Sequence, residues 1–149
     1  MPRIPLSVVV LLMLALPGVR ATAQMSGYDS NPRFDTRAKN VSILQLIANP
    51  QAYDGKRVRL IGFLRLEFEG NALYLHREDF EHAISNDALW VDPPRDMTKE
   101  QRQSVNNQYV ICEATFRASG HGHMGLFSGE LAEVTRLEFW SPGVSISPR

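Results

Sequence analysis

The chain has 149 residues, of which 44% are hydrophobic and 21% are charged, which is enough for one packed domain and excludes a wholly disordered chain. A single cysteine excludes an internal disulfide and a zinc site built on several cysteines. The formal net charge of 0 lacks the excess of Lys and Arg that binders of phosphate backbones carry, so we expect no nucleic acid among the partners.

Residues 1–23 have the pattern of a secretory signal peptide. Arg3 makes the start basic, residues 4–16 are mostly apolar, and residues 21–23 (Ala-Thr-Ala) offer a cleavage site. The alternatives are an uncleaved anchor and a buried helix, but the apolar run is shorter than the roughly 20 residues that span a bilayer. We therefore expect a bacterial protein that is periplasmic or secreted and has no transmembrane segment after cleavage.

The first half of the mature chain predicts a short helix and a long strand. Residues 24–40 are polar and aperiodic, which is typical of a flexible N-terminal segment. Ser42 is a suitable N-cap for a helix with a broad apolar face, and Pro50 is expected to end that helix. Apolar and polar side chains then alternate over residues 57–68, which indicates a half-buried strand, and Gly62 in its middle indicates a bend or a close backbone approach.

The second half predicts four more strands and one more helix. Thr98 and Gln101 match a capping box, which places a helix between the third and fourth strands. Cys112 falls at an apolar-facing position of the fourth strand, so we expect a buried, unreactive thiol, and the alternation of the last strand slips once, which indicates a bulge. The expected segments are a hairpin turn at 69–71, strands at 72–76, 88–91, 109–117 and 131–140, a helical or irregular excursion at 77–86, a helix from 99 to about 105, a glycine-rich loop at 119–130 and a tail at 141–149.

This order of elements predicts the fold class. A long first strand, two more strands, a helix and two final strands follow the order of an OB-fold, a five-stranded Greek-key barrel. The alternative is an open antiparallel sheet with a helix on one face. We expect a mainly β (α+β) OB-fold-like domain over residues 41–140, with a short N-terminal helix and a helix between strands 3 and 4 of the barrel.

The entry to the first strand resembles that of small exported bacterial OB-fold proteins. Those proteins have a helix, a proline, a tyrosine, a Gly-Lys pair, a valine-containing strand and a glycine, which correspond here to Pro50, Tyr53, Gly55, Lys56, Val58 and Gly62. Residues 62–75 and 122–129 also resemble segments of bacterial proteins of this size. The resemblance implies the barrel fold and export, and it carries over no catalytic residue.

Two loops form the candidate site. OB-folds bind mostly through the face of strands 2 and 3 and through the loops joining strands 1 to 2 and 4 to 5. The first of these loops carries Glu67 and Glu69, and the second carries His121 and His123. Imidazole and carboxylate both bind zinc and copper, so His121, His123 and Glu67 are candidate metal ligands. The simpler interpretation is a flexible, solvated turn, since the spacing fixes no further ligand.

Met124, Leu126 and Phe127 in the second loop would offer apolar contacts if exposed, and would otherwise close the mouth of the barrel. Our first hypothesis is an exported, non-enzymatic module without a cofactor that binds an unknown protein, peptide or small ligand of the cell envelope through the two loops. The second is a metal-binding protein or metalloenzyme that carries zinc or copper on the histidines and glutamates. The third is a structural envelope protein that contacts only a partner protein.

Overall fold

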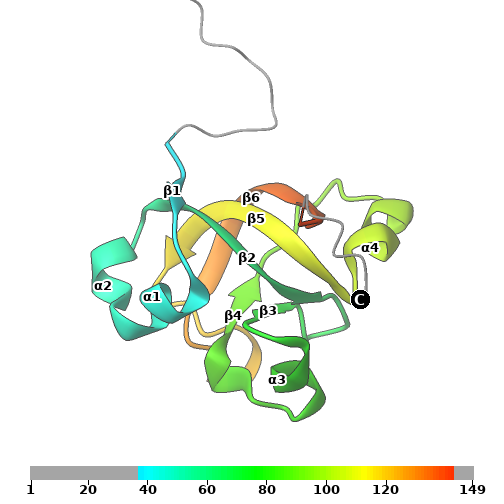
Figure 1. Ribbon diagram of the computed structural model, residues 1–149. Helices are drawn as coiled ribbons and strands as arrows, with labels where there is room; N and C mark the ends of the chain where they lie inside the picture. The colour runs from blue at the N-terminus through cyan, green and yellow to red at the C-terminus, as the bar shows by residue number, and fades with distance from the viewer. Residues whose placement is uncertain (1–36, 143–149) are drawn as a thin grey trace, which may run out of the picture. The chain divides into compact units, whose positions relative to one another are not determined.

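The computed structural model describes residues 37–142 and shows a closed five-stranded β-barrel with a few short helices (Figure 1). The expected signal peptide, most of the expected flexible segment and most of the expected tail lie outside the described residues. The strands are β1 (Lys39–Asn40), β2 (Arg57–Arg65), β3 (Ala72–Tyr74), β4 (Ala88–Val91), β5 (Gln108–Arg117) and β6 (Glu130–Phe139). The helices are α1 (Ile43–Ala48), α2 (Pro50–Tyr53), α3 (Arg77–Glu81) and α4 (Lys99–Val105), with single 3-10 turns η1 (Ser85–Asp87) and η2 (His123–Gly125).

The order of the strands around the barrel is that of an OB-fold. Neighbours follow β2-β3-β4-β6-β5, and β5 pairs back onto β2, which closes the barrel. These pairs are antiparallel except for β4 with β6, which is parallel. Helix α4 lies in the connection between β4 and β5, where the sequence predicts it. The mainly β, OB-fold-like prediction is therefore confirmed, and the closure excludes the open sheet.

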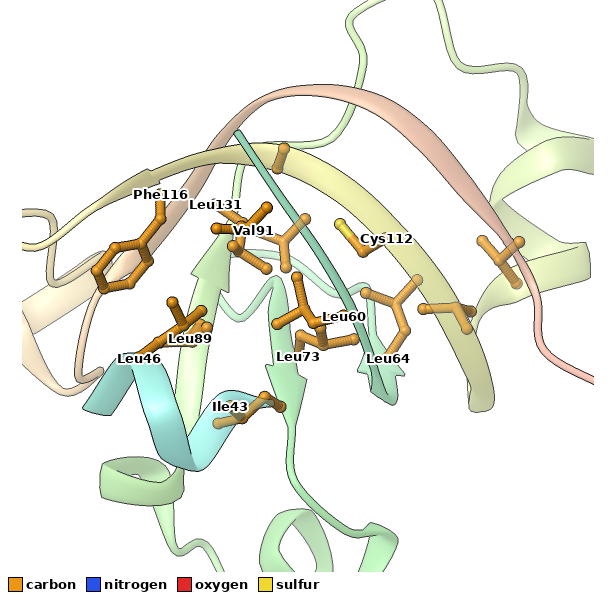
Figure 2. Close-up of a cluster of buried hydrophobic side chains, with 14 of the residues drawn as sticks. Ile43, Leu46, Leu60, Leu64, Leu73, Leu89, Val91, Cys112, Phe116 and Leu131 are labelled. Carbon is orange, nitrogen blue, oxygen red and sulfur yellow. The ribbon is translucent and has the colours of Figure 1, made fainter. Parts of the chain in front are cut away.

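Alternation along the strands sorts side chains between the barrel interior and its outer surface. Val58, Leu60 and Leu64 of β2 are buried in the interior, as the alternation predicts. Cys112 of β5 and Phe116 lie in the same cluster (Figure 2). At about 25 cal/mol per Å² of apolar surface removed from water, this continuous cluster is the main source of the free energy that stabilises the barrel.

Gly62 lies in the inward series at the point where β2 passes β3. A Cβ at this position would come within 2.7 Å of the Leu73 side chain and within 2.7 Å of the Tyr74 carbonyl oxygen. Both distances are shorter than Cβ atoms tolerate, so only glycine allows the two strands to approach this closely. The close backbone approach predicted at Gly62 is confirmed.

Both predicted helix caps are present. The Ser42 hydroxyl accepts from the Gln45 amide while the Gln45 side chain accepts from the Ser42 amide, and Thr98 and Gln101 make the same pair of bonds at α4. The helix that Ser42 caps ends before Pro50, as predicted: α1 ends at Ala48, and Asn49 lies outside the helical region with φ −143° and ψ 62°. Pro50 then begins α2, because the first turn of a helix does not need the N–H that proline lacks.

Two strands are shorter than predicted. β2 ends at Arg65, three residues early, because the Asn106 side chain takes both backbone groups of Leu66: the Leu66 amide donates at 2.8 Å, and the Leu66 carbonyl accepts at 3.1 Å. β3 ends two residues early because the His76 amide donates to the Asp79 carboxylate at 2.7 Å and so begins α3. At both of these points, the chain leaves the sheet where a side chain bonds the backbone in place of the neighbouring strand.

A buried carboxylate lies on the side of β2, β5 and β6 that faces away from the barrel interior. Glu113 of β5 is only 1% exposed. Its Oε1 accepts from Arg59 Nε at 2.7 Å and from Arg136 Nη1 at 3.3 Å. The register between β5 and β6 shifts beside this cluster, between Glu113 and Thr115, and Glu133 adopts a φ of 50°. This irregularity is the bulge predicted for the last strand.

Candidate functional site

The two predicted loops meet. The β2–β3 loop (residues 66–71) and the β5–β6 loop (residues 118–129) are joined by Glu69 and His123, whose Oε2 and Nε2 atoms lie 3.6 Å apart. This pair carries opposite charges only when the imidazole is protonated, and both side chains are exposed. The structure thus brings one histidine and one glutamate of the predicted site together.

The β5–β6 loop is held against the barrel by its own bonds and by ring contacts. His121 Nδ1 lies 2.8 Å from the Phe127 carbonyl oxygen, and the Phe127 amide donates to the His121 carbonyl at 3.2 Å. Gly122 has a φ of 60° and lies so close to the Trp90 ring that a Cβ would be 2.5 Å from it. The Phe127 ring also packs on Trp90, with centroids 5.6 Å apart. These contacts fix the position of the loop.

Three large apolar side chains on the same two loops are exposed. Phe68 in the β2–β3 loop is 91% exposed, and Met124 and Leu126 in the β5–β6 loop are 78% and 49% exposed. Phe127, in contrast, is buried. The β5–β6 loop therefore has both of the roles that the sequence allows, because Phe127 closes against the barrel while its neighbours face solvent. We call Phe68, Met124 and Leu126 the apolar tip.

Sequence reasoning missed Phe68 as a site residue. It continues the apolar alternation of β2 and was therefore expected inside the barrel, but it lies in the turn after the strand. Glu69, the next residue, adopts a φ of 56°, which is typical of a tight turn. The available signal was the Glu-Gly-Asn sequence of residues 69–71, which predicts a turn directly after Phe68. If this turn begins one residue earlier, at Phe68, that side chain is no longer part of the strand.

The predicted metal ligands are not gathered around one point. Glu67 accepts from Arg65 Nε at 3.0 Å, and one ring nitrogen of His121 already contacts a backbone carbonyl. Within residues 37–142, no three His, Cys, Asp or Glu side chains lie close enough together to hold a metal ion. This part of the chain offers zinc or copper the adjacent pair of Glu69 and His123, one ligand fewer than the three protein ligands of a catalytic zinc site.

The outer face of β2, β3 and β4 is covered by the chain itself. Phe80 of α3 packs on Phe63 and Tyr74, with ring centroids 6.1 and 5.5 Å away. Trp90 and Phe127 cover the adjoining part of the same face. This face is the usual ligand surface of OB-folds, and here α3 together with Trp90 and Phe127 covers it.

Burial raises the pKa values of two side chains of the barrel, Cys112 and Tyr74. It raises the pKa of the Cys112 thiol to about 12, so this thiol stays protonated at neutral pH and is not a nucleophile. Burial, with a smaller contribution from the negative charge of Glu67, also raises the pKa of Tyr74. Cys112 is thus buried as expected and contributes packing.

A hollow of about 480 Å³ lies between α4 and β6, away from the two loops. Among the described residues that line it, Asp96 is the one ionisable side chain, so the hollow holds no acid–base pair. The remaining lining is apolar, hydroxyl or amide: Pro94, Met97, Thr98, Gln101, Ser104, Val105, Val134, Thr135 and Leu137. Thr98 and Gln101 already bond each other in the cap of α4.

Comparison with known proteins adds little to what the structure shows. No protein-family model matches the chain, and no curated protein matches its sequence. Among solved structures, the chain is similar to one from Leishmania major Friedlin that is provisionally described as an aspartyl-tRNA synthetase, with 16% sequence identity and a TM-score of 0.42. The similarity covers 83% of this chain and 23% of that chain. At this distance it carries no argument for a shared function.

One expectation about partners is wrong. The balanced charge led us to exclude nucleic acid, yet the similar solved chain is described as a synthetase named for a tRNA. Net charge describes the sum over the chain and not the potential of any one surface, so it could not support that exclusion.

In residues 37–142, no helix is both long enough and apolar enough to cross a membrane.

Proposed function

We propose that this protein is an exported module that acts by binding a protein or peptide through its apolar tip. The observation that supports this most is the exposure of Phe68, Met124 and Leu126 on two loops that touch each other through Glu69 and His123. Grouped apolar side chains in water are costly and typically mark interaction surfaces.

The anchoring of the β5–β6 loop supports the same proposal. Gly122 and Phe127 pack on Trp90, and the loop closes on itself through His121. A loop that is already ordered loses little conformational freedom when a partner binds, so more of the contact energy appears as affinity. The loop is therefore suited to present Met124 to a partner.

The chemistry of the site favours binding over catalysis. The Glu69–His123 pair is exposed, and catalytic acid–base groups usually lie in partly enclosed sites. The buried Cys112 thiol is protonated. Export belongs to the proposal through residues 1–23, and it predicts a processed chain that begins at Gln24 outside the cytoplasm.

The test begins with peptides selected from a random library on the purified protein. Their affinities are measured by fluorescence anisotropy for the wild type and for the double variant Phe68→Gln/Met124→Gln. The matched control is Leu44→Gln, since Leu44 is 55% exposed but lies on α1. We expect the double variant to lose about tenfold or more in affinity, because exposed apolar anchors carry most of the energy of small interfaces. Equal affinities for the wild type and the double variant would contradict the proposal.

A further inference from the structure

The two loops of the apolar tip carry carboxylates and no Lys or Arg. Residues 66–71 include Glu67 and Glu69, and residues 118–129 include no Asp, Glu, Lys or Arg. The ionisable side chains of the second loop are His121 and His123. When the imidazoles are neutral, the loops therefore have a negative charge beside the exposed apolar side chains.

The two carboxylates differ in the cation that faces them. Glu67 lies 3.0 Å from the guanidinium of Arg65, which is charged at every physiological pH. Glu69 faces His123 at 3.6 Å, and an imidazole contributes a positive charge only when it is protonated. Both Glu69 and His123 are about half exposed. A cation from outside can therefore approach Glu69 more favourably than Glu67.

Chain order places this carboxylate beside the apolar side chains. Phe68 directly precedes Glu69, and Met124 directly follows His123. Glu69 and His123 are in contact, so Phe68 and Met124 are each next in sequence to one member of this pair. The surface thus offers an apolar contact and a negative charge side by side.

We infer that the partner of the apolar tip is a protein segment that presents a Lys or Arg next to an apolar side chain, with the cation on Glu69 and the apolar group on Phe68 and Met124. The inference rests on the proposed function and adds the charge of the partner to it. Charge complementarity favours such a segment over an anionic lipid surface, which the loop carboxylates repel.

The test uses three capped hexapeptides that share a Leu-Leu centre and differ in the flanking residues: Gly-Lys-Leu-Leu-Lys-Gly, Gly-Gln-Leu-Leu-Gln-Gly and Gly-Glu-Leu-Leu-Glu-Gly. Each is titrated to millimolar concentration into the isotopically labelled protein, and amide NMR shifts of the two loops give the dissociation constants. We expect the lysine peptide to bind about threefold to fivefold more tightly than the glutamine peptide, as for other exposed ion pairs, and the glutamate peptide to bind most weakly.

The variant Glu69→Gln should remove the preference for lysine. The matched control is Glu133→Gln, because Glu133 is an exposed glutamate on β6 that pairs with Arg117. Salt should weaken the lysine peptide alone.

Two results would overturn the inference and leave the proposed function intact. One is equal binding of the three peptides to the wild type, with loss of all three in Phe68→Gln/Met124→Gln. The other is an unchanged lysine preference in Glu69→Gln. Stronger sedimentation with phosphatidylglycerol vesicles than with phosphatidylcholine vesicles would also overturn it, in favour of a membrane. If no hexapeptide binds and no library peptide depends on the tip, the proposed function fails as well.

Discussion

Replacing Glu113 by Gln should destabilise the barrel strongly. The side chain is 1% exposed, and its Oε1 accepts from Arg59 at 2.7 Å and from Arg136 at 3.3 Å. Gln has nearly the same size but no charge, so both guanidinium groups lose the charge of Glu113, and Arg136 keeps its pair with Glu138 at 3.0 Å. Removing one partner of a buried ion pair costs about 3–5 kcal/mol, a large share of the roughly 5–15 kcal/mol by which domains are stable.

The measurement is thermal unfolding of the wild type, Glu113→Gln and the control Glu133→Gln. At about 4 °C per kcal/mol for a domain of this size, Glu113→Gln should lower Tm by about 12–20 °C. Glu133 is an exposed glutamate 3.0 Å from Arg117, so its replacement should cost about 0–1 kcal/mol and at most a few degrees. If the two variants unfold within about 3 °C of each other, the buried ion pairs of Glu113 stabilise the barrel no more than the exposed ion pair of Glu133 does.

Three further outcomes are expected. Gly62→Ala should cost about 1–3 kcal/mol in urea unfolding, because the added methyl group meets side-chain and backbone atoms at 2.7 Å, and a neutral result would show that β2 and β3 can separate. The raised pKa of Cys112 means that the folded state disfavours deprotonation of this thiol. The contribution of the protonated thiol to the free energy of unfolding is therefore complete below the ordinary thiol pKa of 9.0 and is lost as pH rises from there toward about 12. At pH 10 the loss is on the order of 1 kcal/mol, and it should be absent from the pH dependence of Cys112→Ala. Elemental mass spectrometry of the untagged protein should find no stoichiometric zinc or copper, whereas one metal ion per chain that is lost in His121→Ala/His123→Ala would support the metal-binding alternative.

Local patterns predicted the elements that depend on local physics. The capping boxes at Ser42 and Thr98 need only a side chain and the next turn of backbone, so residue types at a spacing of three reveal them. The inward series of β2 and the position of Cys112 follow from the period of two. The order of these elements then favoured the barrel over an open sheet, and the pairing of β5 with β2 decides between the two.

Tertiary contacts decided what the local patterns did not. Nothing near Leu66 in the sequence shows that Asn106, forty residues away, will bond its backbone and end β2. That bond is the reason Phe68 lies in a turn and faces solvent, although its place in the alternation predicts burial. The pairing of Glu69 with His123, in preference to the combination of Glu67 with either histidine, likewise depends on the conformation of both loops.

The covered barrel face and the exposed apolar tip are parts of one arrangement. In the β5–β6 loop, Phe127 and Gly122 pack on Trp90, and Met124 lies between these two residues in the sequence and is exposed to solvent. α3 covers the rest of the same face through Phe80. Closing the usual ligand surface of an OB-fold and presenting a rigid apolar loop therefore follow from the same packing. Substitutions that loosen Phe127 should weaken the proposed binding even though Phe127 itself is buried.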